Sequence, residues 1–399
     1  MPFWFHLILM AQAAALAVAS QTLGAAPPGQ AAEDRVVIAV GGDVLPESSW
    51  EGAQDALHFL DGMRAQFAQA DLVFVNLEEP ITSSRQVTPF KSQSSVAAKR
   101  DYILRAKNSE IPAALKAEGI GLVGLANNHM MDYTPAGLRD TLQALRQAEL
   151  PEVGAGLKLE AEQPFILQKH GLRVALLAFS DVVPRNAGAS ETRLGIASAK
   201  DEQDLADAIH RADRQADFVV LMIHWGGQGS HLILPRQRQL ARTAVAAGSD
   251  VIVGMHPHVL QGIEYIGRVP VLYSIGNFAF ASKRPASQET VLVKLEFGPE
   301  RLEEVDLVPV VISPGGVPTL AGEEQGKEIL GHLDGFCRMF NAQVRGGRLM
   351  TSSPRGPLAY APTGPKGSHS AARQRTTRRT SNHKDGARKP AQAGTGGGR

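Results

Sequence analysis

An alternation of short apolar runs with longer amphipathic segments begins at Arg35 and constrains the fold more than any other feature of this sequence. Five apolar runs have the length of buried strands, at residues 36–40, 72–75, 121–125, 218–223 and 251–254. Segments with a helical spacing of apolar residues span 51–70, 111–118, 135–147, 201–215 and 236–247. Strands that alternate with helices in this way predict a mainly parallel sheet.

Three further pairs of apolar runs are separated by short turns and predict antiparallel strand pairs. These pairs are 165–169 with 173–179, 260–266 with 269–273, and 291–297 with 302–311. Antiparallel pairs beside a parallel sheet indicate a second, antiparallel or mixed sheet. We therefore expect one α/β domain of two packed sheets over residues 35–312, followed by a C-terminal extension over residues 313–351.

The N-terminal segment has the composition of a leader. Residues 3–19 are mainly apolar, Ala17-Val18-Ala19 has the small residues of a cleavage motif, and a spacer rich in Pro, Gly and Ala follows. Arg35 is the first basic residue, so the basic region usual in a signal peptide is missing. We interpret residues 1–34 as a signal peptide or membrane anchor plus spacer, which predicts an exported or membrane-anchored, extracytoplasmic protein. The alternative is an apolar leader on a cytoplasmic protein.

The C-terminal segment is strongly basic. Residues 352–399 contain ten Lys or Arg and one acidic residue, Asp385, although the net charge of the whole chain is only +1. A segment this poor in apolar residues cannot bury enough surface to order itself. We predict a basic disordered tail. It either contacts an anionic polymer, nucleic acid or lipid head groups, or is a solvated extension with no partner of its own; we expect no specific nucleic-acid partner.

Side chains with metal-binding atoms follow five of the predicted strands. They are Asp43, Glu78, Asn127, Asn128, His129, His224, His256 and His258. Ligands of open α/β sheets bind beyond the carboxyl ends of the strands, so we expect these residues to converge on one edge of one sheet. Each residue alone has an ordinary structural explanation. Together their oxygen and nitrogen atoms exceed the needs of one ion and suit two ions about 4 Å apart, as in two-metal hydrolysis.

Two histidines, His256 and His258, flank Pro257 directly after the last of these strands. This spacing allows one imidazole to reach each of two ions, and the proline reduces the cost of ordering both rings. The single cysteine, Cys337, excludes both an internal disulfide and a metal site built from several cysteines.

Six motifs occur in an order that resembles a known family. They are GGDVL, NLEEPIT, ANNHMMDY, HWG, GMHPHVLQGIE and YSIGNFAF. The chain resembles the CapA family of poly-γ-glutamate capsule synthesis proteins, a branch of the calcineurin-like metallophosphatase superfamily, over roughly residues 36–311. The resemblance implies a metallo-dependent phosphatase-like fold, a four-layer αββα sandwich with two mixed β-sheets.

The resemblance also implies a set of metal ligands. Asp43 and His258 correspond to ligands of one ion, and His224 and His256 to ligands of the second. Glu78 occupies the place of a bridging aspartate. Asn128 corresponds to an amide ligand. The implied cofactors are two divalent ions, Mn, Fe or Zn.

Other residues correspond to groups that meet the substrate. His129 is the expected catalytic residue, which contacts substrate or protonates a leaving group. Asn127 is expected in substrate binding. Tyr273 and Asn277, in the last motif, either line the site or shape a turn after a core strand.

Two positions depart from the family pattern. Leu45 stands where the phosphatases have a histidine two residues after the first aspartate, as is common in the CapA branch. Gln228 stands where the branch usually has Glu in His-Trp-Gly-x-Glu. Because of these two departures, the resemblance alone does not decide whether the protein is catalytic.

Three functions remain after this comparison. The first is a CapA-like role in synthesis or export of poly-γ-glutamate, a capsule or envelope polymer, with a dinuclear metal hydrolase site and membrane-associated synthesis partners. The second is a metallophosphoesterase for a small phosphoester or a nucleotide. The third is a non-catalytic accessory that binds an anionic polymer. The first is the interpretation that we favour.

Overall fold

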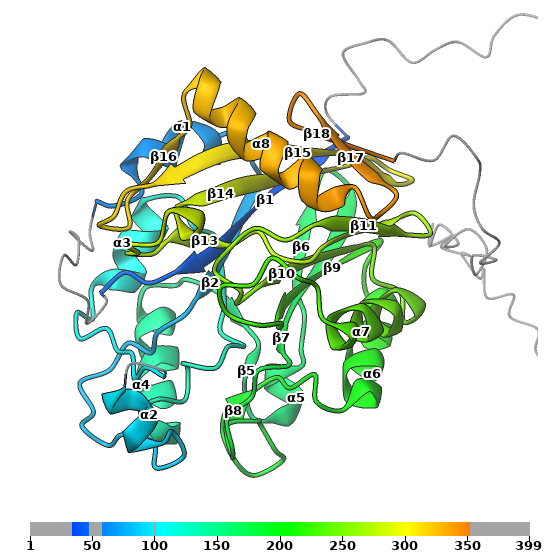
Figure 1. The fold of residues 1–399 in the computed structure, drawn as a ribbon. Helices are drawn as coiled ribbons and strands as arrows, with labels where there is room; N and C mark the ends of the chain where they lie inside the picture. The colour runs from blue at the N-terminus through cyan, green and yellow to red at the C-terminus, as the bar shows by residue number, and fades with distance from the viewer. Residues whose placement is uncertain (1–33, 48–57, 99–100, 352–399) are drawn as a thin grey trace, which may run out of the picture. The chain divides into compact units, whose positions relative to one another are not determined.

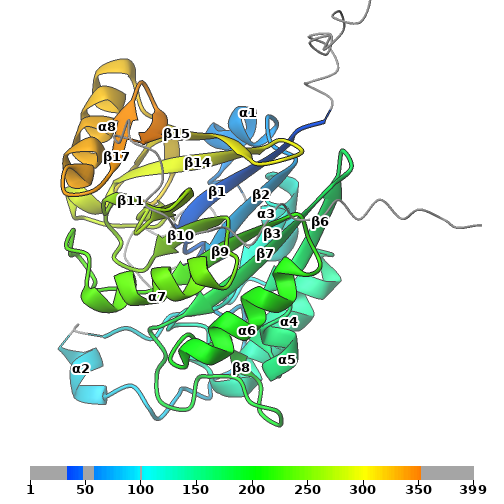
Figure 2. The same ribbon diagram turned by 90° about the vertical axis from the view of Figure 1, so that its right-hand side faces the viewer.

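The computed structural model describes residues 34–47, 58–98 and 101–351, which form four layers (Figures 1 and 2). A ten-stranded sheet and a six-stranded sheet pack face to face, and helices cover their outer faces. The predicted four-layer αββα sandwich with two mixed sheets is therefore confirmed.

The ten-stranded sheet has the order β17-β18-β15-β14-β1-β2-β3-β4, with β13 beside β1 and β16 beside β15. Strands β1 to β4 and β13 are parallel, whereas β14 to β18 pair in antiparallel fashion. The strands are β1 (Val36–Val44), β2 (Leu72–Leu77), β3 (Leu122–Gly124), β4 (Glu152–Val153), β13 (Asn277–Ala279), β14 (Glu289–Phe297), β15 (Leu302–Ile312), β16 (Pro318–Leu320), β17 (Ala342–Arg345) and β18 (Arg348–Thr351).

The six-stranded sheet has the order β11-β12-β10-β9-β7-β6. Its four inner strands are parallel, and the two edge strands β6 and β11 are antiparallel to their neighbours. The strands are β6 (Phe165–Lys169), β7 (Leu172–Ser180), β9 (Phe218–His224), β10 (Val251–Met255), β11 (Ile263–Ile266) and β12 (Val269–Leu272). Strands β5 (Ala155–Gly156) and β8 (Gly195–Ile196) form a separate small pair.

The packing of the sheets follows from the alternation of side chains along each strand. In β1, Val36, Ile38 and Val40 belong to the apolar cluster that includes the strands of the six-stranded sheet. Ala39, between them, belongs to a second cluster with residues of the covering helices. Strand β1 is therefore buried on both faces, as its continuous apolar sequence predicts.

Helices cover both sheets. Helices α1 (Arg64–Phe67), α3 (Ile111–Ala117) and α4 (Thr134–Gln147) contribute to the cluster on the ten-stranded sheet. Helices α6 (Glu202–Asp213) and α7 (Pro235–Ala246) pack on the six-stranded sheet (Figure 2). The buried residues of α6, at 205, 208, 209 and 212, have the spacing of one helix face. The remaining helices are α2 (Gln93–Ala97), α5 (Lys158–Ala161) and α8 (Glu323–Cys337).

The helix expected over residues 51–70 is wrong in the part that the structure describes. Residues 61–63 form a 3₁₀ turn, and the α-helix that follows covers only Arg64–Phe67. Gly62 packs closely against β16, because a Cβ there would lie 3.1 Å from the carbonyl oxygen of Pro318. Contact with a distant strand thus replaces the regular helix that local periodicity favours.

The residues after 312 continue the same compact unit. Strands β16 to β18 extend the ten-stranded sheet, and α8 packs against β15 and β17. The buried thiol of Cys337, at the end of α8, accepts a hydrogen bond from the backbone nitrogen of Ile263 at 3.3 Å. Helix α8 is therefore attached to both sheets.

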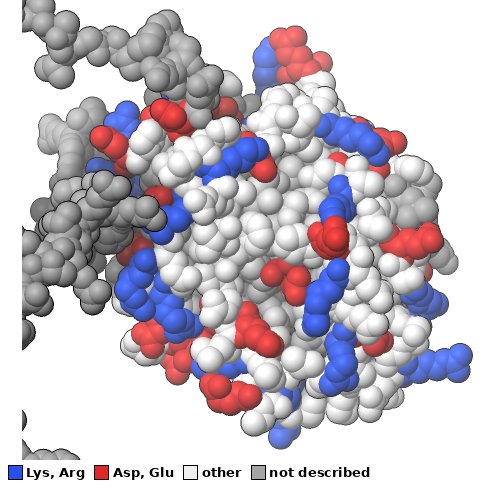
Figure 3. All heavy atoms as spheres, turned by 180° about the vertical axis from the view of Figure 1, so that it is seen from behind, with Lys and Arg blue, Asp and Glu red and all other residues white. Residues whose placement is uncertain are grey.

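The predicted leader, up to residue 33, and the predicted basic tail at 352–399 lie outside the described residues. Within the described ranges, no helix is both long and apolar enough to cross a membrane. On the face shown in Figure 3, acidic and basic side chains occur side by side around a central area of uncharged side chains.

Candidate metal centre

The predicted site residues come together where strands of both sheets end. The ten-stranded sheet and its following loops contribute Asp43, Glu78 and Asn128. The six-stranded sheet contributes His224, His256 and His258. The expectation that all lie on one edge of one sheet is therefore wrong. Apolar spacing shows where a strand ends, but it does not show to which sheet the strand belongs.

The two glycines before Asp43 permit a close approach between β1 and the turn before β13. A Cβ on Gly42 would lie 2.0 Å from the carbonyl oxygen of Gly276, so a side chain there would force the backbone apart. The pairing of β1 with β2 also shifts register between Val40 and Asp43. An irregularity of this kind re-aims the side chain that follows it, and here it directs the Asp43 carboxylate toward the histidines.

Asp43 and Glu78 are fully buried carboxylates with different surroundings. Asp43 accepts hydrogen bonds from the Asn76 side chain at 2.8 Å and from the backbone nitrogen of His256 at 3.3 Å. Neither carboxylate oxygen of Glu78 has a hydrogen-bond partner among the described residues. A buried, ionised carboxylate without a partner is strongly unfavourable, so Glu78 is the group that most requires a nearby cation.

The histidine side of the site is crowded with nitrogen atoms. The Nε2 atom of His224 lies 2.7 Å from Asn128 Oδ1, 2.9 Å from His256 Nδ1 and 3.6 Å from Glu78 Oε1. The Nδ1 atom of His258 lies 3.2 Å from Asp43 Oδ2. A neutral imidazole carries one proton and cannot satisfy so many neighbours. A cation at this convergence would satisfy them together.

The backbone of the His-Pro-His segment is held in an unusual conformation. His256 has a φ of 93° and His258 a φ of 57°, in the region that side-chain-bearing residues rarely adopt. Residues persist in such conformations when the surrounding structure holds them there, which is frequent at functional sites. This backbone conformation brings the imidazoles of His256 and His258 into the same cluster, as predicted from the His-Pro-His spacing.

The charges of the cluster perturb its titration. Burial raises the pKa of Glu78 well above its ordinary value, and the Asp43 carboxylate raises it further. Burial lowers the pKa of His224 and of His256, and the neighbouring imidazoles lower both further. Burial also opposes the charge of His258, but Glu78 and Asp43 outweigh it and raise the pKa of His258 to about 9. The cluster thus combines two imidazoles that favour the neutral form, His224 and His256, with a third, His258, that favours the charged form beside the two buried carboxylates.

These residues form two overlapping groups with the atoms of a metal site. In each group the potential ligand atoms lie within 4.8 Å of one another, and Glu78 belongs to both. One group is Asp43, Glu78 and His224; the other is Glu78, His256 and His258. Carboxylate oxygens and neutral imidazole nitrogens are ligands of divalent transition metals. The residues present therefore fit a divalent metal ion, with Glu78 at the centre of the donor set.

His129 sits beside this cluster and contacts two charged groups. Its Nδ1 atom lies 2.8 Å from Asp132 Oδ2 and 3.0 Å from Lys91 Nζ. Lys91 Nζ lies 2.5 Å from the other oxygen of Asp132 and donates to the carbonyl oxygen of Tyr102 at 2.8 Å. Lys91 and Asp132 are both almost fully buried, and together they fix the orientation of the His129 ring.

Asn127 is fully engaged within the chain. Its amide nitrogen donates to Asn76 Oδ1 at 3.1 Å and to the carbonyl oxygen of Leu77 at 2.8 Å. Its amide oxygen accepts from the backbone nitrogens of His129 and Met130. The structure therefore places Asn127 as a brace that shapes the turn carrying His129, while its expected contact with substrate stays a prediction.

Asn277 and Tyr273 lie in different surroundings. The Asn277 amide oxygen lies 2.9 Å from His258 Nδ1, so Asn277 reaches the cluster. The Tyr273 hydroxyl instead donates to Glu264 at 2.8 Å, and its ring stacks on Trp225. The backbone carbonyl oxygen of Tyr273 also accepts a hydrogen bond at 2.8 Å from the indole of Trp225, the residue that follows His224.

Lys91 and Asn76 are the site residues that sequence reasoning missed. Lys91 lies in a polar stretch, and no spacing relates it to a strand end. Asn76 lies inside β2, two residues before Glu78. A polar side chain in a fully buried strand could have been recognised as a candidate site residue. Of the two departures from the family pattern, Leu45 is buried beside the site strand and Gln228 is exposed.

Comparison with known proteins agrees with the motifs. Residues 37–282 match the family described as "Bacterial capsule synthesis protein PGA_cap". The chain is 32% identical over 256 residues to "Capsule biosynthesis protein CapA" of Bacillus anthracis, covering 61% of this chain and 62% of that protein. It is also 32% identical over 264 residues to "PGA biosynthesis protein CapA" of Bacillus subtilis (strain 168), covering 66% of each. The chain thus spans slightly less than two thirds of either relative.

A solved structure described as a putative 5'-nucleotidase from Staphylococcus aureus superposes with a TM-score of 0.45 at 16% identity, over 75% of this chain and 59% of that chain. A similarity at this level does not bear on the activity. The family match, by contrast, includes every residue of the two ligand groups. Because it extends over more than half of the sequence, the chain belongs to the bacterial capsule synthesis protein family PGA_cap.

Proposed function

We propose that this protein acts in the synthesis or export of poly-γ-glutamate or a related anionic envelope polymer, through a dinuclear metal hydrolase site. The observation that carries the proposal is Glu78, a fully buried carboxylate shared by two ligand groups, in a chain of the capsule synthesis family. The named relatives are capsule biosynthesis and PGA biosynthesis proteins, which supports an extracytoplasmic place of action.

The two ligand groups would hold two divalent ions, Mn, Fe or Zn. The resemblance pairs Asp43 with His258 and His224 with His256, whereas the two groups of nearby ligand atoms divide the histidines differently. On these groups, Asp43 and His224 would belong to one ion, His256 and His258 to the other, and Glu78 to both. Asn128 would add an amide oxygen next to His224. When bound, such ions activate a water molecule and stabilise the negative charge that develops during hydrolysis.

The protein's own contribution to proton transfer would come from His129. Its Nδ1 atom faces Asp132 and Lys91, which leaves Nε2 as the atom that exchanges a proton with the substrate. Burial lowers the pKa of His129 and the Lys91 ammonium lowers it further, whereas the Asp132 carboxylate raises it. An imidazole held in a fixed orientation can transfer a proton to or from a reacting group, which is the role proposed for His129.

The test uses the purified full-length protein loaded with Mn²⁺, Fe²⁺ or Zn²⁺. Poly-γ-glutamate, phosphomonoesters and phosphodiesters are supplied in parallel, and product is measured as new amine, as free phosphate and as the alcohol released from the phosphodiester. The Asp43→Asn variant is the matched control, because it keeps the shape of the site and removes one charge. Cleavage of the γ-glutamyl bond that is lost in Asp43→Asn is the expected result.

Cleavage of phosphoesters alone would replace the proposed substrate with a small phosphoester. Metal binding without cleavage of any of these substrates would overturn the hydrolytic part of the proposal. In that case binding of the polymer to the unaltered protein would assign a non-catalytic role.

A further inference from the structure

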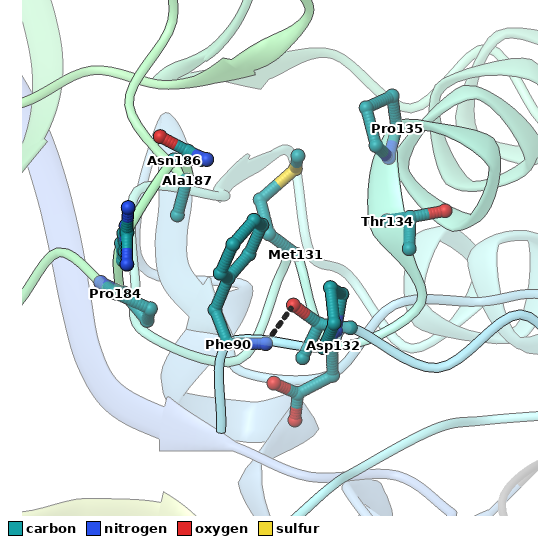
Figure 4. A pocket seen from close by; sticks show the side chains of 11 residues that line it. Phe90, Met131, Asp132, Thr134, Pro135, Pro184, Asn186 and Ala187 are labelled. Atoms are coloured by element: carbon teal, nitrogen blue, oxygen red, sulfur yellow. Dashed lines mark hydrogen bonds between the residues drawn. The ribbon is translucent and has the colours of Figure 1, made fainter. Parts of the chain in front are cut away.

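A pocket lies beside the His129 turn and is formed by three segments: residues 88–90, 131–135 and 184–187 (Figure 4). Phe90 and Met131 lie together in the middle of the view, between Pro184 and Asn186 on one side and Thr134 and Pro135 on the other. The Asp132 carboxylate points away from the Phe90 ring. The walls that remain are mainly apolar.

Arg185 supplies a positive charge to this pocket. Its guanidinium lies over the Phe90 ring, 5.9 Å from the ring centre, and the side chain is exposed. Among the residues that the structure describes, no carboxylate lies within ion-pair distance of Arg185. Asp132, the acidic residue that lines the pocket, is already paired with Lys91. The pocket therefore combines apolar surface with an uncompensated cation.

Two residues that line the pocket are each followed in the chain by a residue that contacts His129, beside the metal centre. Phe90 lines the pocket and is followed by Lys91; Met131 lines it and is followed by Asp132. Lys91 and Asp132 are the two groups that hold the His129 imidazole. A ligand in the pocket would thus lie on the same loops that orient the expected proton donor.

We propose that this pocket is a subsite for one carboxylate-bearing γ-glutamyl unit of the polymer. The unit's free α-carboxylate pairs with Arg185, and its methylene groups pack on Phe90 and Met131. This inference rests on the proposed function, because it assigns a second contact for the same substrate.

The chemistry of the pocket favours a carboxylate on an aliphatic arm. A guanidinium binds a carboxylate through two parallel hydrogen bonds, and its stacking on an aromatic ring pre-orders it for this contact. A purely apolar ligand would leave the cation unpaired. A bare phosphate would leave the Phe90 and Met131 surfaces without a partner.

The test measures binding of a short γ-glutamyl oligomer, such as the trimer, to the full-length protein by calorimetry at physiological salt. A short ligand limits the contribution of basic residues elsewhere in the chain. Arg185→Ala should weaken binding about 10-fold, the value of a charge-assisted hydrogen bond. Arg268→Ala is the matched control, since Arg268 is exposed on the β11–β12 turn and contributes nothing to the pocket.

Three ligands separate the sources of affinity. The same trimer with its α-carboxylates converted to amides should bind about 10-fold more weakly to the unaltered protein and should not distinguish Arg185→Ala from it. Free glutamate and inorganic phosphate should bind more weakly than the trimer. Arg185→Lys should recover part of the affinity, because it restores the charge but not the paired hydrogen bonds.

Equal affinity in Arg185→Ala and Arg268→Ala would overturn the subsite and leave the proposed function standing. Tighter binding of phosphate than of the trimer would also overturn it, in favour of a phosphate site. Absence of trimer binding to the unaltered protein would overturn the subsite, while cleavage of the polymer would still decide the proposed function independently. If the polymer is cleaved, Arg185→Ala should raise KM more than it lowers kcat.

Discussion

The Nε2 atom of His224 lies 2.7 Å from Oδ1 of Asn128, so the last residue of β9 in one sheet meets the loop after β3 in the other. The candidate metal centre therefore exists only when the two sheets are packed together. A ligand that binds such a site binds the folded chain and not the unfolded one, so metal binding and folding are thermodynamically coupled.

Added metal should raise the thermal stability of the protein. A divalent ion at about 100 times its Kd contributes about 2.7 kcal/mol, which corresponds to a rise in Tm of several degrees for a domain of this size. The measurement is thermal unfolding with EDTA and with Mn²⁺ or Zn²⁺, beside elemental analysis of the dialysed protein. About two ions per chain are expected from the two ligand groups.

The double variant His256→Ala/His258→Ala should lose both the bound metal and the Tm increase. His210→Ala is the control, because His210 is exposed on α6 and belongs to neither ligand group. An identical Tm increase in the double variant would place the metal elsewhere.

Glu78→Gln should affect the metal-free and the metal-loaded protein in opposite directions. Because burial raises the pKa of Glu78, its ionised form is disfavoured in the folded state. This cost is present above the pKa of the unfolded chain and disappears as the pH falls. At pH 7 the variant without metal should therefore unfold at a higher temperature than the unaltered protein.

With metal, the same variant should show a reduced Tm increase, because an amide is a weaker ligand than a carboxylate. Thermal unfolding with and without EDTA measures both effects. Glu300→Gln, in the exposed turn between β14 and β15, controls for the change of charge. A metal-free Glu78→Gln protein that is less stable than the unaltered one would contradict the cost assigned to the buried carboxylate.

The outline of the fold and most of the donor residues could be predicted because both depend on local patterns. Apolar runs located β1, β2, β9 and β10, and polar residues that follow these runs are the ones that converge, although β1 continues to Val44 and so includes Asp43. The assignment of strands to two sheets could not be predicted, because it depends on pairing between distant segments. For the same reason, the role of Lys91 could not be predicted, because its partners His129 and Asp132 lie about forty residues later in the chain.

Lys91→Met should strongly destabilise the protein. Removing one member of a buried ion pair leaves the other charge uncompensated and costs about 3–5 kcal/mol. The double variant Lys91→Met/Asp132→Asn should recover at least half of that loss, because neither charge of the pair remains. Unfolding in urea measures both variants. Lys116→Met is the control: its ion pair with Glu149 is exposed, so it should change stability by less than about 1 kcal/mol.

Equal destabilisation in the single and double variants would contradict the ion pair as the cause. It would assign the role of Lys91 to the packing of its aliphatic stem.

Tyr273→Phe and Asn277→Ala should separate a structural residue from one that supports the cluster. The Tyr273 hydroxyl contacts Glu264, so its removal should cost about 1 kcal/mol in stability and leave metal affinity unchanged. Asn277 contacts His258, so its truncation should weaken metal affinity about 10-fold. Metal titration and urea unfolding of both variants are the measurements. A loss of metal affinity in Tyr273→Phe would show that the Tyr273 hydroxyl contributes to the metal site.

Cys337 should be unreactive in the folded protein. Burial raises the pKa of its thiol to about 11, although the hydrogen bond from Ile263 partly opposes this. At pH 8 the reactive thiolate is therefore roughly 100-fold scarcer than for a thiol with an ordinary pKa, and α8 also shields the sulfur. Because the chain has a single cysteine, labelling with Ellman's reagent reports on this site alone. Slow labelling that becomes fast and stoichiometric in guanidinium chloride is expected. Fast labelling without denaturant would show that α8 detaches from β11 in the native state.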